Sequence, residues 1–408
     1  MLFDPARHEP LRALRWSEND ARAAIERIVV DTEARFVEDR YWRPHPLDCD
    51  NDADRDRITT PLYDGACGVF WALHYLEALG AVGLSRSYLN GTDWLLERNR
   101  AWLGRFAESE RASFLMGDTP IRLLSFGVRK ARSSEEDLAE LIAGNVDHPA
   151  RELMWGSPGT LLAALFLYER TGSERWAELF RSTAANLWSR LEWSARYRCS
   201  YWTQERHGRR STYLDAVHGF VGTALPLIRG RHLLGAEEWI AWERCIVDTV
   251  RRTVDRAGPQ INWRPELDDR GDRRKRLMQF CHGAPGFVVC LAGLPNRELD
   301  DLLLAAGETV WEAGPLAKGS NLCHGTGGNG YALLKIYRRT ADPLWLDRAR
   351  AFAMHGIAQT EHHARHYGQL RYSLWTGDLG FAIYLQDCIE PEDPRFPTLD
   401  VFFGPNVD

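Results

Sequence analysis

Two stretches of this 408-residue chain carry side chains suited to holding a metal ion. Each opens a glycine-rich loop with the tripeptide Cys-His-Gly, once at Cys281 and once at Cys323. Two cysteine thiolates and one histidine imidazole are a frequent zinc ligand set, and the fourth position stays open where the metal is catalytic. We therefore predict that Cys281, Cys323 and His324 bind one zinc ion.

This ligand set favours sulfur chemistry over hydrolysis. Zinc with two thiolates and one neutral imidazole carries no net charge, so it polarises a carbonyl group weakly. It still removes the proton from a coordinated thiol at neutral pH, and the sulfur stays nucleophilic. The residues thus predict alkylation of a thiol, or addition of a thiol to an electrophile. His282, which follows the first ligand, is expected to orient the loop.

The two loops belong to a pattern that recurs along the chain. A Gly-x-x-Gly element is followed each time by an apolar run, and in one degenerate copy Pro120 replaces the second glycine. Glycine lacks a Cβ, so each loop can turn sharply and approach a neighbour closely. The seven copies begin at Gly65, Gly117, Gly156, Gly219, Gly283, Gly325 and Gly377.

Each copy predicts a loop, a buried inner helix and an amphipathic outer helix, as in residues 175–191 and 344–359. Such units cannot bury their apolar faces alone and must stack. Their spacing varies from about 40 to about 64 residues, which is irregular for an open solenoid. We therefore predict an all-α fold, a closed α/α toroid of about seven inner and seven outer helices. Its glycine loops would converge at one end.

The domain organisation follows from the same pattern. Residues 1–60 are expected to form an N-terminal helical extension packed on the ring, and residues 61–408 the catalytic toroid. Strand signals are few, and residues 198–204 could form a short hairpin arm.

Composition narrows the class of protein. The net charge of −6 and the pI of about 6.1 give no sign of nucleic-acid binding. We expect no transmembrane segment, because no run of about 18 apolar residues occurs. The charged N-terminus does not look like a signal peptide, so a cytoplasmic location is expected. In a reducing cytosol the eight cysteines should not form a disulfide framework.

The Cys-His-Gly-Ala-Pro-Gly block at 281–286 and the Cys-His-Gly block at 323–331 resemble the two zinc loops of the lanthionine synthetase C family. The blocks at 114–118 and 152–156 are closer to its LanC-like branch. The likeness covers about residues 60–388. It implies addition of a zinc-bound thiolate to the β-carbon of dehydroalanine or dehydrobutyrine, which forms a thioether. In the LanC-like branch the thiol is glutathione and the acceptor is a dehydrated protein site.

The resemblance also implies roles for further residues. His218 matches the family's active-site histidine, so we expect it to protonate the enolate that thiol addition creates. Glu152 stands four residues before Gly156, where the peptide cyclases look to have an aspartate, and a structural hydrogen bond is favoured for it. Lys318 is expected to hold a glutathione carboxylate. Three more side chains are expected to line the same cavity: Asn321, Asn329 and Tyr331.

Other functions stay open at this point. The chain could be a lanthipeptide cyclase acting on a dedicated peptide, or a non-catalytic zinc-containing binding protein. It could also be another α/α-toroid enzyme, prenyltransferase-like or carbohydrate-active. The 16 tryptophans suit a carbohydrate enzyme, but no evident carboxylate pair accompanies the glycine loops. Because the sequence shows no dehydratase region, a partner or spontaneous elimination would have to supply the dehydroamino acid.

Overall fold

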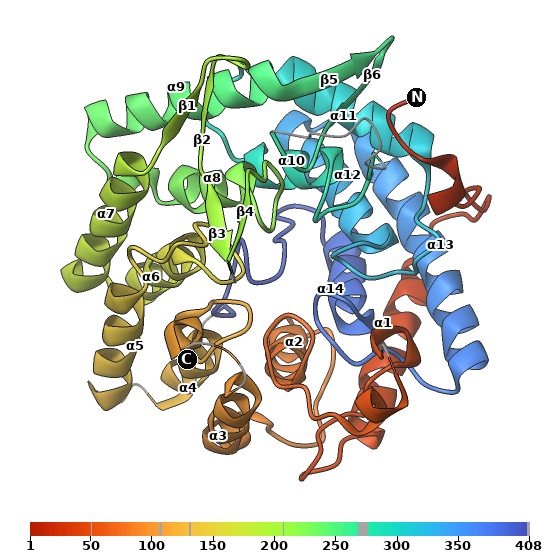
Figure 1. The fold of residues 1–408 in the computed structure, drawn as a ribbon. Coiled ribbons are helices and arrows are strands. Elements are labelled where there is room, and N and C mark those ends of the chain that lie inside the picture. The colour runs from red at the N-terminus through yellow and green to blue at the C-terminus, as the bar shows by residue number, and fades with distance from the viewer. Residues whose placement is uncertain are drawn as a thin grey trace.

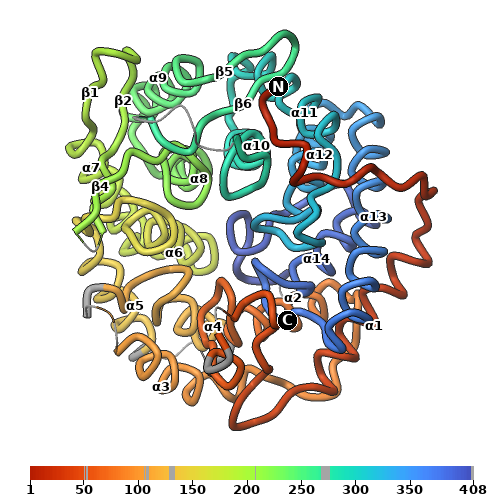
Figure 2. Tube along the Cα trace, turned by 45° about the vertical axis from the view of Figure 1, so that its right-hand side comes forward, coloured from red at the N-terminus to blue at the C-terminus, as the bar shows by residue number. Residues whose placement is uncertain are grey.

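The computed structural model describes residues 1–49, 51–104, 106, 108–129, 132–206, 208–267 and 276–405. Its helices form two concentric rings, as Figures 1 and 2 show from two directions. Across these ranges, no helix has both the length and the apolar character needed to cross a membrane.

Among the described residues, seven helices form the inner ring, and each follows directly on one of the glycine loops. Each inner helix contacts the next along the chain, and the last contacts the first, so the ring is closed. The predicted closed α/α toroid is confirmed. The inner helices are α2 (Ala66–Ala78), α4 (Thr119–Arg129), α6 (Ser157–Thr171), α8 (Phe220–Arg229), α10 (Ala284–Leu291), α12 (Thr326–Thr340) and α14 (Asp378–Ile389).

The outer helices lie around this ring and are more polar than the inner ones. Helix α6 buries every residue from Ser157 to Leu167, as expected for a helix packed on all sides. The helix after it buries one face only. The outer helices are α3 (Thr92–Leu103), α5 (Arg132–Gly144), α7 (Glu174–Ser189), α9 (Ala236–Thr253), α11 (Asp300–Ala313), α13 (Pro343–Tyr367) and α1 (Glu18–Ala34).

Helix α1 completes the outer ring, because it packs against α14 and α13. The predicted N-terminal extension therefore supplies an outer helix. The segment before it runs along the ring, where the Glu9 amide donates a hydrogen bond to the Pro315 carbonyl at 2.8 Å. The division into residues 1–60 and 61–408 stays a prediction.

The glycine loops are joined to one another by backbone hydrogen bonds at one end of the ring. The Tyr63 amide donates to the Leu115 carbonyl at 3.1 Å, and the Cys281 amide donates to the Cys323 carbonyl at 3.0 Å. Among the residues that the structure describes, six of the seven junctions between neighbouring loops contain such a bond. The junction between the loops at 214–222 and 279–286 is bridged by side chains instead.

Glycine is required where a loop passes under its neighbour. A Cβ on Gly286 would overlap the Phe280 carbonyl oxygen and would lie 2.6 Å from the Cβ of Ala216. Only a residue without a side chain permits this close approach. The second glycine of the element therefore sets how tightly adjacent loops pack.

The segment after α14 crosses the centre of the ring, where Figure 1 shows it as a dark blue coil. The Phe396 ring stacks on Phe280 with 4.4 Å between centroids, and Trp71 Nε1 donates to the Phe402 carbonyl at 2.7 Å. The Phe396 contact packs behind the loop carrying Cys281, and the Phe402 contact joins the segment to α2. The segment after α14 therefore supports the loops from inside the ring through buried aromatic contacts.

The described part of the chain also forms three two-stranded antiparallel sheets. The single arm expected at 198–204 is instead shared by two hairpins, so that prediction is corrected. Residues 199–201 pair with residues 192–194, whereas residues 204–206 pair with residues 209–211. The sheets are β1 (Glu192–Ser194) with β2 (Cys199–Tyr201), β3 (Gln204–Arg206) with β4 (Arg209–Ser211), and β5 (Val254–Ala257) with β6 (Gln260–Trp263).

Candidate active site

Cys281, Cys323 and His324 come together at the loop end of the ring. Their potential ligand atoms, two sulfurs and one ring nitrogen, all lie within 4.8 Å of one another. Both cysteines are buried, while His324 is half-buried. This is a donor set that zinc prefers, and the spacing lets one ion contact all three with little side-chain adjustment. The residues therefore fit the predicted metal.

The two thiols interact with each other. The hydrogen bond between their sulfurs holds the pKa of Cys281 well above its usual value and lowers the pKa of Cys323. The pair therefore favours one thiol and one thiolate. A bound cation would favour loss of the remaining proton, since metals bind the thiolate form.

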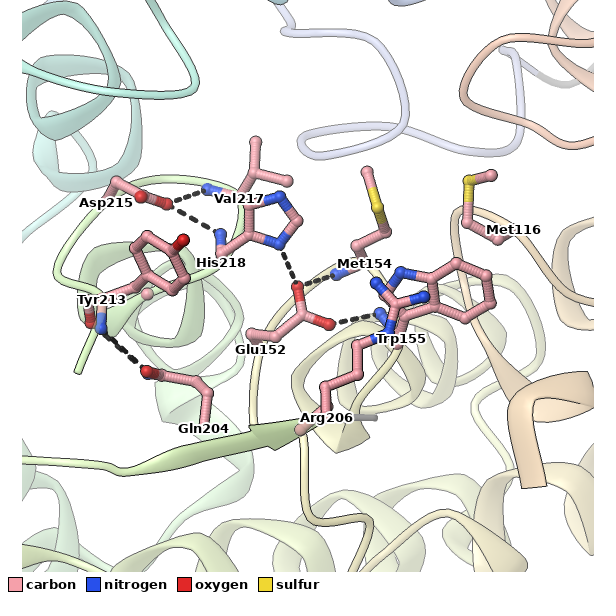
Figure 3. Close-up of polar contacts among 12 residues, drawn as sticks. Met116, Glu152, Met154, Trp155, Gln204, Arg206, Tyr213, Asp215, Val217 and His218 are labelled. Atoms are coloured by element: carbon pink, nitrogen blue, oxygen red, sulfur yellow. Dashed lines mark hydrogen bonds and ion pairs between the residues drawn. The ribbon is translucent and has the colours of Figure 1, made fainter. Parts of the chain in front are cut away.

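His218 stands on the neighbouring loop, hydrogen-bonded to Glu152 (Figure 3). Its Nδ1 lies 2.9 Å from Glu152 Oε2. The Glu152 carboxylate is 4% exposed, and it also accepts the backbone N–H groups of Met154 at 3.0 Å and Trp155 at 2.6 Å. Glu152 thus makes the structural hydrogen bonds that were expected, and it touches His218 as well.

The contact with Glu152 determines the charge of His218. Burial disfavours the protonated ring, but the hydrogen bond to Glu152 and its negative charge, with smaller contributions from Asp215 and Cys281, outweigh burial and raise the pKa of His218 to about 9. The ring is therefore protonated at neutral pH. With 31% of its side chain exposed, it can reach a substrate. This combination suits a general acid.

Asp215 connects His218 to the loop of the first cysteine. Its Oδ1 accepts the backbone N–H of His218 at 2.7 Å, and its Oδ2 lies 2.7 Å from His282 Nδ1. The His218 and His282 rings are 6.5 Å apart between centroids, and His282 directly follows Cys281. His218 and Cys281 therefore belong to one connected cluster.

The other residues predicted for the site lie in different environments. Lys318 is exposed, whereas Asn321, Asn329 and Tyr331 are buried. Asn321 Oδ1 accepts the backbone N–H of His324 at 3.0 Å, which fixes that ligand's loop. Asn329 donates to the Met278 carbonyl at 2.9 Å, and the Tyr331 hydroxyl donates to Asp387 at 2.8 Å. The contacts of these three side chains are therefore with the protein itself.

Sequence reasoning missed three residues that surround the site. The Tyr63 hydroxyl donates to Cys323 Sγ at 2.9 Å, and Gln279 Nε2 donates to Cys281 Sγ at 2.9 Å. The third residue is Asp215, which contacts the His218 backbone and His282. A signal did exist, because Asp215 and Gln279 stand four residues before a loop glycine, the same place as Glu152.

A model of the family described as lanthionine synthetase C-like protein matches residues 58–401. Glutathione S-transferase LANCL1 of Danio rerio is 31% identical over 205 residues, 49% of this chain and 47% of that protein. LanC-like protein GCL1 of Arabidopsis thaliana is 29% identical over 264 residues, 61% of this chain and 58% of that protein. The chain thus aligns with about half of the length of these curated relatives.

The fold is also similar to that of a solved structure. Nisin cyclase superposes with a TM-score of 0.60, covering 92% of this chain and 100% of that one, at 14% sequence identity. Similarity at this level of identity concerns the arrangement of helices. The superposition thus agrees with the closed toroid seen in Figure 1.

Proposed function

Because the chain belongs to the lanthionine synthetase C-like family, we propose that it catalyses the addition of a thiol to dehydroalanine or dehydrobutyrine residues of a peptide or protein. The product is a thioether. Glutathione is the proposed thiol, supported by the name of the similar Danio rerio protein. The observation that carries the proposal is the convergence of Cys281, Cys323 and His324 beside a protonated His218.

In this proposal, Cys281, Cys323 and His324 hold zinc. When bound, the metal would lower the pKa of an incoming thiol, and two thiolate ligands would leave that sulfur electron-rich enough to attack carbon. The three side chains come from two loops whose backbones are hydrogen-bonded to each other, so their relative positions are fixed before substrate arrives.

His218 completes the addition as the general acid. As the sulfur bonds to the β-carbon, the electron pair of the carbon–carbon double bond moves toward the α-carbon and its carbonyl. His218 then delivers a proton to the α-carbon. The proton lost by the thiol restores His218, so the net reaction adds S–H across the double bond. Glu152 holds the ring in place and keeps it charged.

Lys318 is the proposed contact for glutathione. Its ammonium is exposed on the segment that leads into the Cys323 loop, five residues before that cysteine. A cation there attracts a carboxylate of the tripeptide without entering the reaction. The buried side chains of Asn321, Asn329 and Tyr331 would support the site through the loop and the helix that they hold.

The test is direct. Purified protein is incubated with glutathione and a peptide containing dehydroalanine, and mass spectrometry detects the glutathione adduct. We expect the adduct with the wild type and with Cys290→Ala, which removes a buried cysteine outside the cluster. Cys323→Ala should not form it. A wild type that binds zinc but forms no adduct would contradict the proposal.

A peptide that carries both a cysteine and a dehydroalanine separates the cyclase alternative. If it closes on itself while glutathione is ignored, the thiol is an internal cysteine. Absence of both products from a zinc-loaded protein would favour a binding role. The carbohydrate-active and prenyltransferase-like alternatives do not agree with the family that the chain belongs to.

A further inference from the structure

Each sulfur of the cysteine pair accepts a hydrogen bond from a side chain that is not a metal ligand. The Tyr63 hydroxyl donates to Cys323 Sγ, and the Gln279 amide donates to Cys281 Sγ, both at 2.9 Å. The two donors come from different loops and serve different sulfurs. Each sulfur therefore accepts one such hydrogen bond, although the donor is a tyrosine in one case and a glutamine in the other.

Contacts with Leu115 and Trp375 hold Tyr63 in place. Its backbone is part of the ring of loop hydrogen bonds, because its amide donates to Leu115 and its carbonyl accepts from Trp375. Its aromatic ring packs against Trp375 with 5.8 Å between centroids. The hydroxyl is thus held against Cys323 by contacts on both sides.

Gln279 is oriented by a residue from the other end of the chain. Arg7 Nη2 donates to Gln279 Oε1 at 3.1 Å. A guanidinium has donors and no acceptor, so it requires the amide oxygen to face it. The amide nitrogen must then face Cys281, and the side chain is only slightly exposed, at 4% for the whole residue.

Arg7 is held in turn by the segment that carries it. His8 pairs with Leu316 in an isolated antiparallel bridge, and His8 Nδ1 lies 2.9 Å from the Gly314 carbonyl oxygen. The Leu2 amide donates to Gln260 Oε1 at 3.0 Å. The N-terminal segment is therefore attached on both sides of Arg7.

From these contacts we propose that Tyr63 and Gln279, the latter oriented by Arg7, are positioning residues that tune the two metal-binding thiolates. A hydrogen bond to a thiolate withdraws electron density from the sulfur, so the sulfur donates less to the metal. The metal then acidifies an incoming thiol more strongly. This inference rests on the proposed zinc site and adds to it the residues that set its electronic character.

Cobalt(II) in place of zinc tests the proposal without any turnover. Thiolate-to-cobalt charge-transfer absorption moves to lower energy when the sulfur becomes richer in electrons. We expect this shift in Tyr63→Phe and in Gln279→Met, and a larger one in the double variant, since each donor serves its own sulfur. Arg7→Met should shift the band in the same direction. The double variant of Arg7→Met and Gln279→Met should show the same band position as Gln279→Met alone, because Arg7 acts through that amide.

Tyr384→Phe is the matched control. It also removes a hydroxyl from a buried tyrosine, one that donates to the Ala349 carbonyl and contacts Cys388, which is not one of the proposed metal ligands. The band of this variant should stay at the wild-type position. Unchanged bands in both Tyr63→Phe and Gln279→Met would overturn the inference while leaving the proposed function intact. A wild type that shows no thiolate-to-cobalt band would instead contradict the metal site itself.

Discussion

The carboxylate of Asp215 and the imidazole of His282 lie 2.7 Å apart, and this contact bridges the junction between the loops at 214–222 and 279–286. Asp215 is fully buried, and its other oxygen accepts the backbone N–H groups of Val217 and His218. One carboxylate therefore joins two consecutive repeats. It also links the loop of His218 to the loop of Cys281.

Replacing Asp215 with asparagine should destabilise the ring. The variant loses the charge-assisted bond to His282, whose pKa is raised by the charge and hydrogen bond of Asp215 against the effect of burial. We expect a loss of about 2–4 kcal/mol in the free energy of unfolding, because a buried bonded charge is removed. Urea unfolding followed by circular dichroism measures it.

Asp147→Asn is the control for this substitution. Asp147 pairs with Arg190 at 2.6 Å, but both side chains are about half exposed. Such a pair contributes about 1 kcal/mol or less. Equal losses of unfolding free energy in the two variants would show that Asp215 stabilises the fold no more than an exposed ion pair does.

The proposed role of His218 as proton donor predicts how the rate depends on pH. Because His218 must be protonated and its pKa is about 9, the catalysed rate should fall as the pH rises through about 9. In Glu152→Gln the negative charge that raises this pKa is gone, so the fall should occur at lower pH. Rates of thioether formation are measured against pH after subtraction of the uncatalysed addition.

Two results would contradict the assignment of His218. One is a Glu152→Gln profile that coincides with the wild-type profile above neutral pH. The other is a His218→Gln variant that retains the wild-type rate although its zinc content is normal. Either result would leave the histidine as a structural group of its loop.

Much of the site could be predicted because its residues stand at equivalent positions of the repeat. Cys281 and Cys323 both stand two residues before a loop glycine, and His218 and His324 both stand one residue before. Loops that meet at one end of a closed ring must bring such positions together. The convergence of Cys281, Cys323 and His324 could therefore be predicted from residue type and spacing.

The hydrogen bonds to the sulfurs could not be predicted in that way. Tyr63 is 260 residues from Cys323 in the chain, and Arg7 is 272 residues from Gln279. These pairings depend on side-chain conformation and on the course of the N-terminal segment, neither of which a repeat pattern specifies. The same limit applies to Tyr331, whose position on an inner helix turns its hydroxyl toward Asp387.

Glycine packing between the loops gives a separate test of the fold. Gly286→Ala should lower the free energy of unfolding by about 2 kcal/mol or more, because the new Cβ meets backbone and Ala216 that cannot move freely. Gly293→Ala is the control, since its Cβ would lie 3.7 Å from Ile228 in ordinary contact. It should be close to neutral. Similar effects of both changes would contradict the close approach of the loops.

The proposed contact between Lys318 and glutathione predicts that the enzyme prefers thiols that carry a carboxylate. Lys318→Ala should raise the KM for glutathione about two- to fivefold, as expected for the loss of one exposed charge contact. The KM for cysteamine, which has no carboxylate, should stay the same, and kcat should change little with either thiol. Equal changes in KM for both thiols would contradict a contact with a glutathione carboxylate.

In the proposed function, a metal held by Cys281, Cys323 and His324 activates the thiol. The most direct measurement removes metal with a chelator, returns zinc in steps, and follows the rate of glutathione addition to a dehydroalanine peptide. The rate should rise in proportion to bound zinc until about one ion per chain, and Cys281→Ala should show no such rise. A metal-depleted wild type that forms the thioether as fast as the zinc-loaded protein would contradict the account.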